Sequence, residues 1–228
     1  MVHGLTLAGE QRSPGITPAT TPTVVQQLRE RIRGMQDGVP RVPIATHPAL
    51  ADLVQLRTGG SYQVDSASLA LVLMSAASQA GAWSAVVGAD DFGAEAAAEM
   101  GIDLRRTVLV PDPGELWLEV TSALVDVVTV VVLRPPGVVS ERVASRVSAR
   151  LRKRSSALVA WGQWPGAEVA LSLSASSWSG ADRGRGRLLS RRVVVDVRRG
   201  TAPPRRAELW LPGRGEPIQR VVEAAPPG

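Results

Sequence analysis

Apolar and polar positions come in alternating blocks between residues 59 and 161, and each block has the length of one helix or one strand. Longer blocks with apolar residues on one repeating face predict helices, whereas short valine-rich runs predict buried strands. The pattern predicts helices at Leu69–Ala80, Asp91–Met100, Pro113–Leu124 and Ser140–Arg154. It predicts strands at Trp83–Ala89, Thr107–Val110, Val125–Leu133 and Ala157–Trp161.

The pattern changes after residue 161, where strand-like segments follow one another with no helix between them. These segments are Glu168–Ala175, Arg187–Arg198 and Ala207–Leu211, and we expect the Ser/Gly/Arg-rich stretch Ser176–Gly186 to be a loop. Such spacing favours antiparallel pairing, while the strict alternation before it favours parallel pairing. The predicted fold class is α/β, a mostly parallel sheet with helices on both faces and antiparallel C-terminal strands.

The segments on either side of this pattern differ from it. Residues 1–22 are rich in Thr, Pro and Gly without an apolar period, so we expect disorder there. Residues 23–58 are predicted to form an N-terminal helix and a linker with three prolines, and the helix presents Val24, Leu28 and Ile32 on one face. We expect the core to span 59–212 and a flexible tail to span 213–228. The apolar groups of the helix, and those around Trp210, either bind a partner or pack on the core.

Composition excludes several classes of protein. The chain has 228 residues, and we find neither a stretch of about 20 apolar residues nor the pattern of a signal peptide. It has no Cys and two His, His3 and His47, which have no clustered partner for a metal site. We therefore expect a cytoplasmic protein without disulfides, thiolate chemistry or a bound metal. We find no Ser-His-Asp set and no pair of carboxylates suited to acid/base catalysis.

Basic residues gather in the C-terminal part of the chain. Residues 141–228 hold 17 of the 26 basic and 7 of the 21 acidic residues, a net charge of +10, against −5 for residues 1–140. This division indicates that the C-terminal half faces a polyanion. A compositional preference would explain why the chain has 25 Arg and one Lys, Lys153, but it would not explain the asymmetry.

Residues 59–71 occupy the place of a phosphate-binding loop, since a Gly-bearing turn runs into an apolar helix and then a strand. A working loop needs a Lys to reach the phosphates and a Ser or Thr to hold Mg²⁺. Here the corresponding positions hold Ser and Ala, and an Asp replaces the second loop Gly. The degenerate nucleotide loop comprises Gly59, Gly60, Asp65, Ser66 and Ala67. We expect a non-catalytic relative of an ATPase without a cofactor, and a cryptic nucleotide-binding enzyme is the weaker alternative.

The order of segments resembles the RecA core. Met100–Leu104 resembles its Leu-Gly-Val-Asp segment, Pro111–Glu115 its Gln-Pro-Asp-Thr-Gly-Glu segment, and Val125–Val131 its Walker B strand. The resemblance implies that the Walker B aspartate is replaced at about Val131, and that the water-activating glutamate falls near Asp90 or Asp91. Those two aspartates, like Asp112, are equally explained as helix caps and turn residues. Gln163 matches the glutamine that opens a DNA-binding loop in RecA.

A narrower resemblance is to the RecA-related accessory protein of the actinobacterial inducible mutagenesis cassette, the ImuA-prime type. It covers roughly residues 23–213 and is carried by Val24–Arg33, Leu158–Gly166, Trp178–Arg192 and Pro204–Gly213. It implies a pseudo-ATPase of the SOS response to DNA damage. Such a protein bridges a Y-family-like polymerase subunit and an error-prone replicative-type polymerase in translesion synthesis. A more distant resemblance is to SulA-type inhibitors of cell division.

Two basic elements are candidate nucleic-acid contacts. The helix Ser140–Arg154 places four cations on one face, where they contact phosphates or an acidic protein surface, or form an ordinary solvated face. In Ser176–Arg187, arginines separated by glycines follow a Trp that can stack on a base, so this stretch either contacts single-stranded DNA, contacts a protein or is a surface loop. The candidate DNA-binding residues are Arg142, Arg146, Arg150, Lys153, Gln163, Trp178, Arg183, Arg185 and Arg187.

Two tryptophans, Trp161 and Trp164, flank Gln163 and either pack in the core or line a binding site at the end of their strand. Our leading hypothesis is a nucleoid-associated adaptor for error-prone DNA synthesis that binds single-stranded or damaged DNA and no membrane. An inhibitor that binds a cell-division protein is the main alternative, and a generic RecA-like DNA-binding protein is another. The inhibitor would not need the basic C-terminal half.

Overall fold

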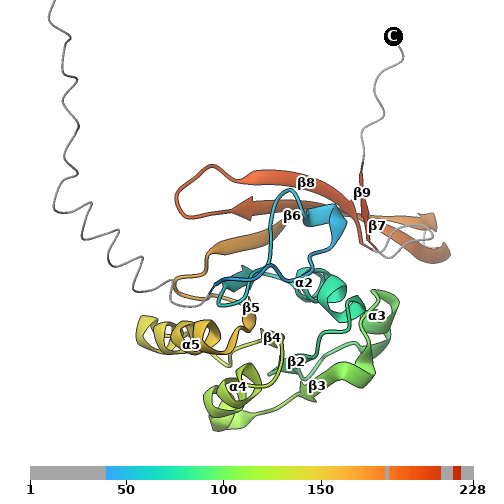
Figure 1. Ribbon diagram of the computed structural model, residues 1–228. Helices are drawn as coiled ribbons and strands as arrows, with labels where there is room; N and C mark the ends of the chain where they lie inside the picture. Colours follow the sequence, from blue (N-terminus) through green and yellow to red (C-terminus); the bar gives the residue numbers. More distant parts are fainter. Residues whose placement is uncertain (1–39, 183–184, 212–217, 222–228) are drawn as a thin grey trace, which may run out of the picture. The chain divides into compact units, whose positions relative to one another are not determined.

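The computed structural model describes residues 40–182, 185–211 and 218–221. The chain divides into the units Met1–Gly38 and Val39–Gly228, and all described residues lie in the second. Figure 1 shows a central sheet with helices against it. The strands are β1 (Ser61–Val64), β2 (Ser84–Val87), β3 (Thr107–Val110), β4 (Val130–Leu133), β5 (Ala157–Trp161), β6 (Val169–Asp182), β7 (Arg185–Arg198), β8 (Arg205–Trp210) and β9 (Gln219–Arg220). The helices are α2 (Ala67–Gln79), α3 (Ala94–Glu99), α4 (Trp117–Val125) and α5 (Glu141–Arg154), with short 3₁₀ turns η1 (Pro48–Leu50), η2 (Leu104–Arg106) and η3 (Gly114–Leu116).

The nine described strands form one sheet in the order β3-β2-β4-β5-β1-β6-β7-β8-β9. All pairs from β3 to β6 are parallel, and the pairs β6–β7, β7–β8 and β8–β9 are antiparallel. The predicted fold class is therefore confirmed, and the sheet is consistent with a RecA-like α/β core. We call strands β1 to β5 with helices α2 to α5 the parallel half, and strands β6 to β9 the antiparallel arm.

Helices cover both faces of the parallel half, and its inner strands β2, β4 and β5 bury side chains on both sides. Residues Val130 and Val132 of β4 pack in one apolar cluster with α2, whereas Val131 and Leu133 pack in a second cluster with α4 and α5. Figure 1 shows α2 on one side of these strands and α4 and α5 on the other. Among the described residues, no helix is both long enough and apolar enough to span a lipid bilayer.

The described part of the predicted linker, residues 40–58, packs against the sheet. Ile44, Leu50, Leu53, Val54 and Leu56 are buried and belong to the same apolar cluster as α2. The hydroxyl of Tyr62 on β1 accepts a hydrogen bond from the Arg57 N–H at 2.7 Å and donates to the Gln55 carbonyl at 3.2 Å. Burial is the main cause that raises the pKa of Tyr62. These contacts join the linker to β1, the central strand of the sheet.

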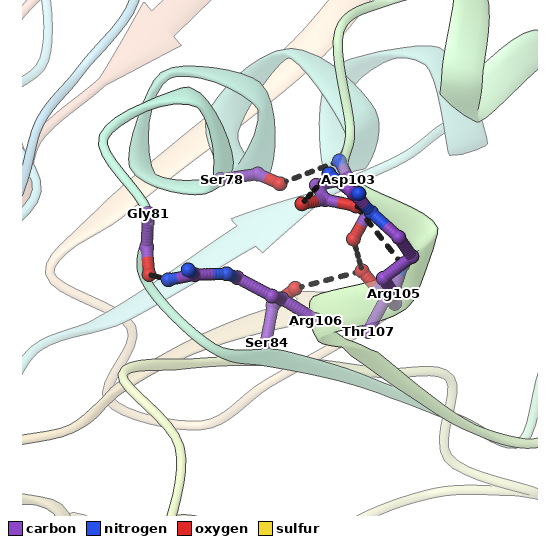
Figure 2. A network of polar contacts seen from close by, with 7 residues as sticks. All are labelled: Ser78, Gly81, Ser84, Asp103, Arg105, Arg106 and Thr107. Carbon is purple, nitrogen blue, oxygen red and sulfur yellow. Dashed lines mark hydrogen bonds and ion pairs between the residues drawn. The ribbon is translucent and has the colours of Figure 1, made fainter.

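A polar network closes the turn before β3, as Figure 2 shows. The backbone N–H of Asp103 donates to the Ser78 hydroxyl on α2 at 2.8 Å, and its carboxylate accepts from Arg105 at 3.0 Å. That hydrogen bond is the main cause that lowers the pKa of Asp103. The Thr107 hydroxyl donates to the Asp103 carbonyl at 2.9 Å. The segment that resembles the Leu-Gly-Val-Asp of RecA therefore fixes the start of β3.

The structure corrects the strand predicted at Val125–Leu133. Helix α4 continues to Val125, a turn follows, and only Val130–Leu133 forms β4. The run is rich in valine because the end of the helix, with Val125, the link, with Val128, and the strand, with Val131 and Leu133, all contribute to one buried cluster, and periodicity cannot separate them. The other strands predicted before residue 161 are confirmed, with shifts of no more than two residues at their ends.

Two predicted irregular segments contain strands. The stretch Ser176–Gly186 is largely strand, because β6 runs to Asp182 and β7 begins at Arg185. A register shift lies within it at Ser179/Ala181, and such a bulge bends a strand without ending it. The predicted tail contains β9, which pairs with β8. The predicted disorder at 1–22 and the helix at 23–35 lie outside the described residues.

Candidate functional site

The carboxyl ends of parallel strands are the usual place for a ligand in an open α/β sheet. In this protein β1 ends at Val64, and Asp65 and Ser66 alone connect it to α2. The glycines of the predicted loop, Gly59 and Gly60, lie before β1, at the opposite end of that strand. The structure therefore separates the five residues of the degenerate loop into two groups. The physical reason is that Ser61–Val64 pairs with β5 and β6 as the central strand.

Asp65 has a structural partner at this turn. Its carboxylate accepts hydrogen bonds from the backbone N–H of Leu173 at 3.0 and 3.3 Å. Strand β6 pairs with β1 only as far as Leu171, so this N–H lies just beyond the end of its partner strand. Ser66 caps α2 by accepting a hydrogen bond from the Leu69 N–H at 3.4 Å. The turn thus joins the parallel half to the antiparallel arm and places a carboxylate where a phosphate loop would offer N–H groups.

The next part of this edge contains Arg134. It follows β4, its guanidinium lies 4.5 Å from the ring centroid of Trp161, and it donates to the Asp91 carboxylate at 2.8 Å. Asp90 lies 3.7 Å away. The adjacent hollow has a volume of about 590 Å³ and is lined by Gly88, Asp90, Asp112, Arg134 and prolines at 111, 113, 135 and 136. The aspartates near the position of the RecA glutamate are therefore ion-pair partners of an arginine.

The two candidate tryptophans differ in environment. Trp161 is half-buried and stacks with Arg134, whereas Trp164 is buried in the cluster with α4 and α5. The indole Nε1 of Trp164 has no hydrogen-bond partner among the described residues. Its backbone N–H donates to the Gln63 side chain at 3.0 Å, while Gln163 is exposed between the two tryptophans. Trp164 therefore packs in the core, and Trp161 lies at the strand edge.

Helix α5 has the amphipathic arrangement predicted for it. Ser140 caps it, Ala144, Val147 and Leu151 are buried, and the four candidate cations are exposed. Arg150 makes a bidentate ion pair with Asp126, at 2.7 and 2.6 Å, and Arg154 lies 3.2 Å from the same carboxylate. The hydrogen bond from Arg150 is the main cause that lowers the pKa of Asp126. The four predicted cations therefore have different environments, because one of them is already paired.

The antiparallel arm brings together a tryptophan and an arginine that sequence reasoning did not connect. Trp178 on β6 is opposite Arg191 on β7, and the guanidinium lies 5.7 Å from the ring centroid. Arg191 also donates to the hydroxyls of Ser176 at 2.8 Å and of Ser68 on α2 at 3.3 Å. This pair therefore lies beside the start of α2. The alternation of side chains along two long strands could have revealed this pair, but the prediction of a loop at Ser176–Gly186 hid that alternation.

The remaining candidates divide into described and undescribed positions. Trp210 ends β8, is half-buried, and lies between Arg192 on β7 and Gln219 on β9. Arg185 and Arg187 belong to β7, but their side chains lie outside the described part of the structure. The positions wholly outside it are Arg183, Val24, Leu28 and Ile32.

Comparison with known proteins places the chain in a family. Residues 49–166 match the model of the MT3502 N-terminal domain. These residues include β1 to β5 and α2 to α5, the whole parallel half. The chain is also 34% identical over 150 residues to the uncharacterized protein Rv3395c of Mycobacterium tuberculosis, and the match covers 63% of this chain and 69% of the relative. The protein belongs to the family of the MT3502 N-terminal domain.

Proposed function

We propose that this protein is a non-catalytic RecA-like adaptor in DNA-damage-induced mutagenesis, of the ImuA-prime type. In this role it bridges a Y-family-like polymerase subunit and an error-prone replicative-type polymerase during translesion synthesis, in the cytoplasm at the nucleoid. One observation carries the proposal: in a RecA-like sheet, the turn that would hold phosphates is used by Asp65 to bind the backbone of β6. The relative in Mycobacterium tuberculosis, itself uncharacterized, is consistent with an actinobacterial protein of this type.

The charges at the strand ends support the absence of ATPase activity. Phosphoryl transfer needs cations around the phosphates and a carboxylate that supports Mg²⁺. Here the turn after β1 offers a carboxylate, and β4, the strand that resembles Walker B, is followed by Arg134. Purified protein should show no ATP hydrolysis above background. Turnover that Asp90→Ala abolishes would contradict the pseudo-ATPase assignment.

The antiparallel arm supports a contact with single-stranded DNA. Trp178 has about half of its surface exposed and lies against Arg191, so an aromatic face and a cation lie together on the paired strands β6 and β7. Aromatic stacking on bases is worth about 1–3 kcal/mol per base, and arginine adds attraction to phosphates. The arm and the exposed cations of α5 both belong to the basic C-terminal half. We assign the DNA contact first to the arm.

A matched pair of tryptophan variants tests this assignment. Trp178→Ala should weaken binding to a single-stranded oligonucleotide about tenfold, which corresponds to about 1.4 kcal/mol. Trp83→Ala is the control, because Trp83 has the same 49% exposure but lies just before β2. Fluorescence anisotropy measures both. Equal affinities for the two variants would remove the arm from the DNA contact.

The cellular role is tested by damage-induced mutation. A strain lacking the gene should lose induced mutations and keep its spontaneous mutation frequency, and the intact gene should restore the induced mutations. A gene with Trp178→Ala should restore them only in part. Normal induced mutation in the deletion strain would refute the mutagenesis role. Filamentation caused by overproduction would then favour the division-inhibitor alternative.

A further inference from the structure

A groove runs between α4 and α5 on the face of the sheet opposite α2. Two hollows of about 320 Å³ each lie along these helices. Both are lined by Leu118, Ser122, Arg146 and Arg150, so they form one continuous groove. We call it the α4–α5 groove. Figure 1 shows the two helices next to each other on this face.

The walls of the α4–α5 groove are cationic. Arg146, Arg150, Lys153 and Arg154 line it from α5. Asp126 pairs with Arg150 and Arg154 and holds them at the groove, as their distances of 2.6 and 3.2 Å show. Arg146 and Lys153 make no ion pair with another described residue. The groove therefore presents two cations held by a carboxylate and two whose charge is available to a ligand.

The rest of the groove is not suited to a nucleic acid. Leu118, Val147 and Ala149 supply apolar surface, and the lining contains no aromatic side chain on which a base could stack. Glu119 lines one end, so a phosphate backbone that ran the length of the groove would meet a like charge, whereas separate carboxylates can pair with the α5 cations away from it. Cations around apolar surface instead match a ligand that has carboxylates and apolar side chains on the same face.

We propose that the α4–α5 groove binds an acidic amphipathic segment of a protein partner. The carboxylates of that segment pair with Arg146 and Lys153, and its apolar side chains cover Leu118 and Ala149. The proposal rests on the adaptor function, because an adaptor needs a surface for a protein partner in addition to its DNA contact. The arm and α5 are both basic, but the proposal gives them different partners: the arm contacts DNA, and α5 contacts a protein.

Peptide selection tests the proposal without knowledge of the partner. The full chain is used to select from a displayed library of random peptides of about 16 residues, roughly four helical turns. We expect the enriched peptides to carry net negative charge and apolar residues three or four positions apart. A library that yields no enriched peptides, or only neutral or basic ones, overturns the proposal.

Charge reversal then locates the site. Arg146→Glu with Lys153→Glu should weaken binding of an enriched peptide by about tenfold or more. Arg152→Glu with Arg198→Glu is the matched control: it changes the charge equally at exposed residues that do not line the groove. The control should change the affinity less than about threefold. Equal losses in the two double variants overturn the proposal.

Two further probes separate the peptide from a general polyanion. A peptide whose apolar residues are replaced by Ser should bind about tenfold more weakly. A single-stranded oligonucleotide should lose less affinity than the peptide when the groove charges are reversed. The opposite result in either probe makes the groove a phosphate site and overturns the proposal. If the groove binds the peptide but deletion of the gene leaves damage-induced mutation unchanged, the groove proposal stands and only the proposed cellular role is refuted.

Discussion

The parallel half and the antiparallel arm belong to one sheet but use their side chains differently. Strands β1 to β5 are four or five residues long, and β2 and β4 are buried along their whole length. Strands β6 and β7 are 14 residues long, and β6 exposes most of its residues between Ser172 and Gly180. The short strands of the parallel half therefore serve mainly the core, whereas the arm buries one face, with Val193, Val195 and Val197, and exposes other side chains such as Trp178. The comparison indicates that stability should depend mainly on the parallel half and that the proposed DNA contact should depend on the arm.

The largest expected effect tests where the stability lies. Leu158→Ala on β5 removes a fully buried side chain and should lower the free energy of unfolding by about 2–5 kcal/mol. Leu189→Ala on β7 removes one that is 56% exposed and should change it by no more than about 0.5 kcal/mol. Urea denaturation followed by circular dichroism measures both. Similar losses for the two variants would show that the arm is as important for stability as the parallel half.

The second prediction compares two glycines with positive φ. Gly88 follows β2 at φ +77°, and an added Cβ would lie 2.2 Å from the Arg134 carbonyl oxygen. Gly200, between β7 and β8, has φ +52° and open space around it. Both alanine variants meet a backbone cost of about 1–2 kcal/mol, and Gly88→Ala adds a clash of about 1–3 kcal/mol. Thermal unfolding should rank Gly88→Ala as clearly less stable, and the reverse order would contradict this account.

The third prediction concerns the junction between the two regions. Asp65→Ala removes the acceptor for the Leu173 N–H and should destabilise the protein by about 0.5–1.5 kcal/mol. Hydrogen exchange should become faster in β6 and β7 but not in β4, because the lost contact holds only the arm. Asp112→Ala is the control, since its carboxylate accepts from the Gly114 N–H within the parallel half. Faster exchange throughout the sheet would mean that the two regions open together.

The same comparison explains what the sequence could predict. In the parallel half, buried strands are apolar runs, and Thr107–Val110 and Ala157–Trp161 are predicted with their observed bounds. The failure at Val125 arises because a buried helix end and a buried strand have the same composition. In the arm, the part of β6 from Ser176 to Gly180 contains Ser, Trp and Gly, since pairing with β7 holds it and most of its side chains are exposed. Pairing between strands that are distant in the sequence produces no local hydrophobic periodicity from which it could be predicted.

The sequence predicts which types of residue form the candidate site, but not which of these residues contact each other. The basic face of α5 follows from its spacing, but the pairing of Arg150 with Asp126 depends on how α4 and α5 pack. Asp65 is visible as a misplaced charge, while its partner, Leu173, is 108 residues away. The stacking of Arg191 on Trp178 requires the register of β6 and β7. Such contacts depend on tertiary structure, so a single sequence does not reveal them.

The smallest expected effect concerns one ion pair in each region. Arg150 in the parallel half and Arg206 in the arm donate to Asp126 and Asp196, and these hydrogen bonds are the main cause that lowers the pKa of both carboxyls. Each carboxylate then stabilises the fold above the unfolded pKa of about 3.9, and the contribution is lost as pH falls through the lower folded-state value. Asp126→Asn and Asp196→Asn should therefore each be slightly less stable than the wild type at pH 7.

Both differences should shrink in urea denaturation as the pH is lowered from about 4 toward about 2, because the unfolded wild-type carboxyls become protonated first. The two carboxylates have side-chain exposures of 22% and 20%, so solvent screens them about equally. Their effects should therefore be similar, although one lies in the parallel half and the other in the arm. A much larger loss for Asp126→Asn would mean that ion pairs, and not apolar burial alone, distinguish the two regions. A difference that persists at low pH would assign the effect to packing instead of charge.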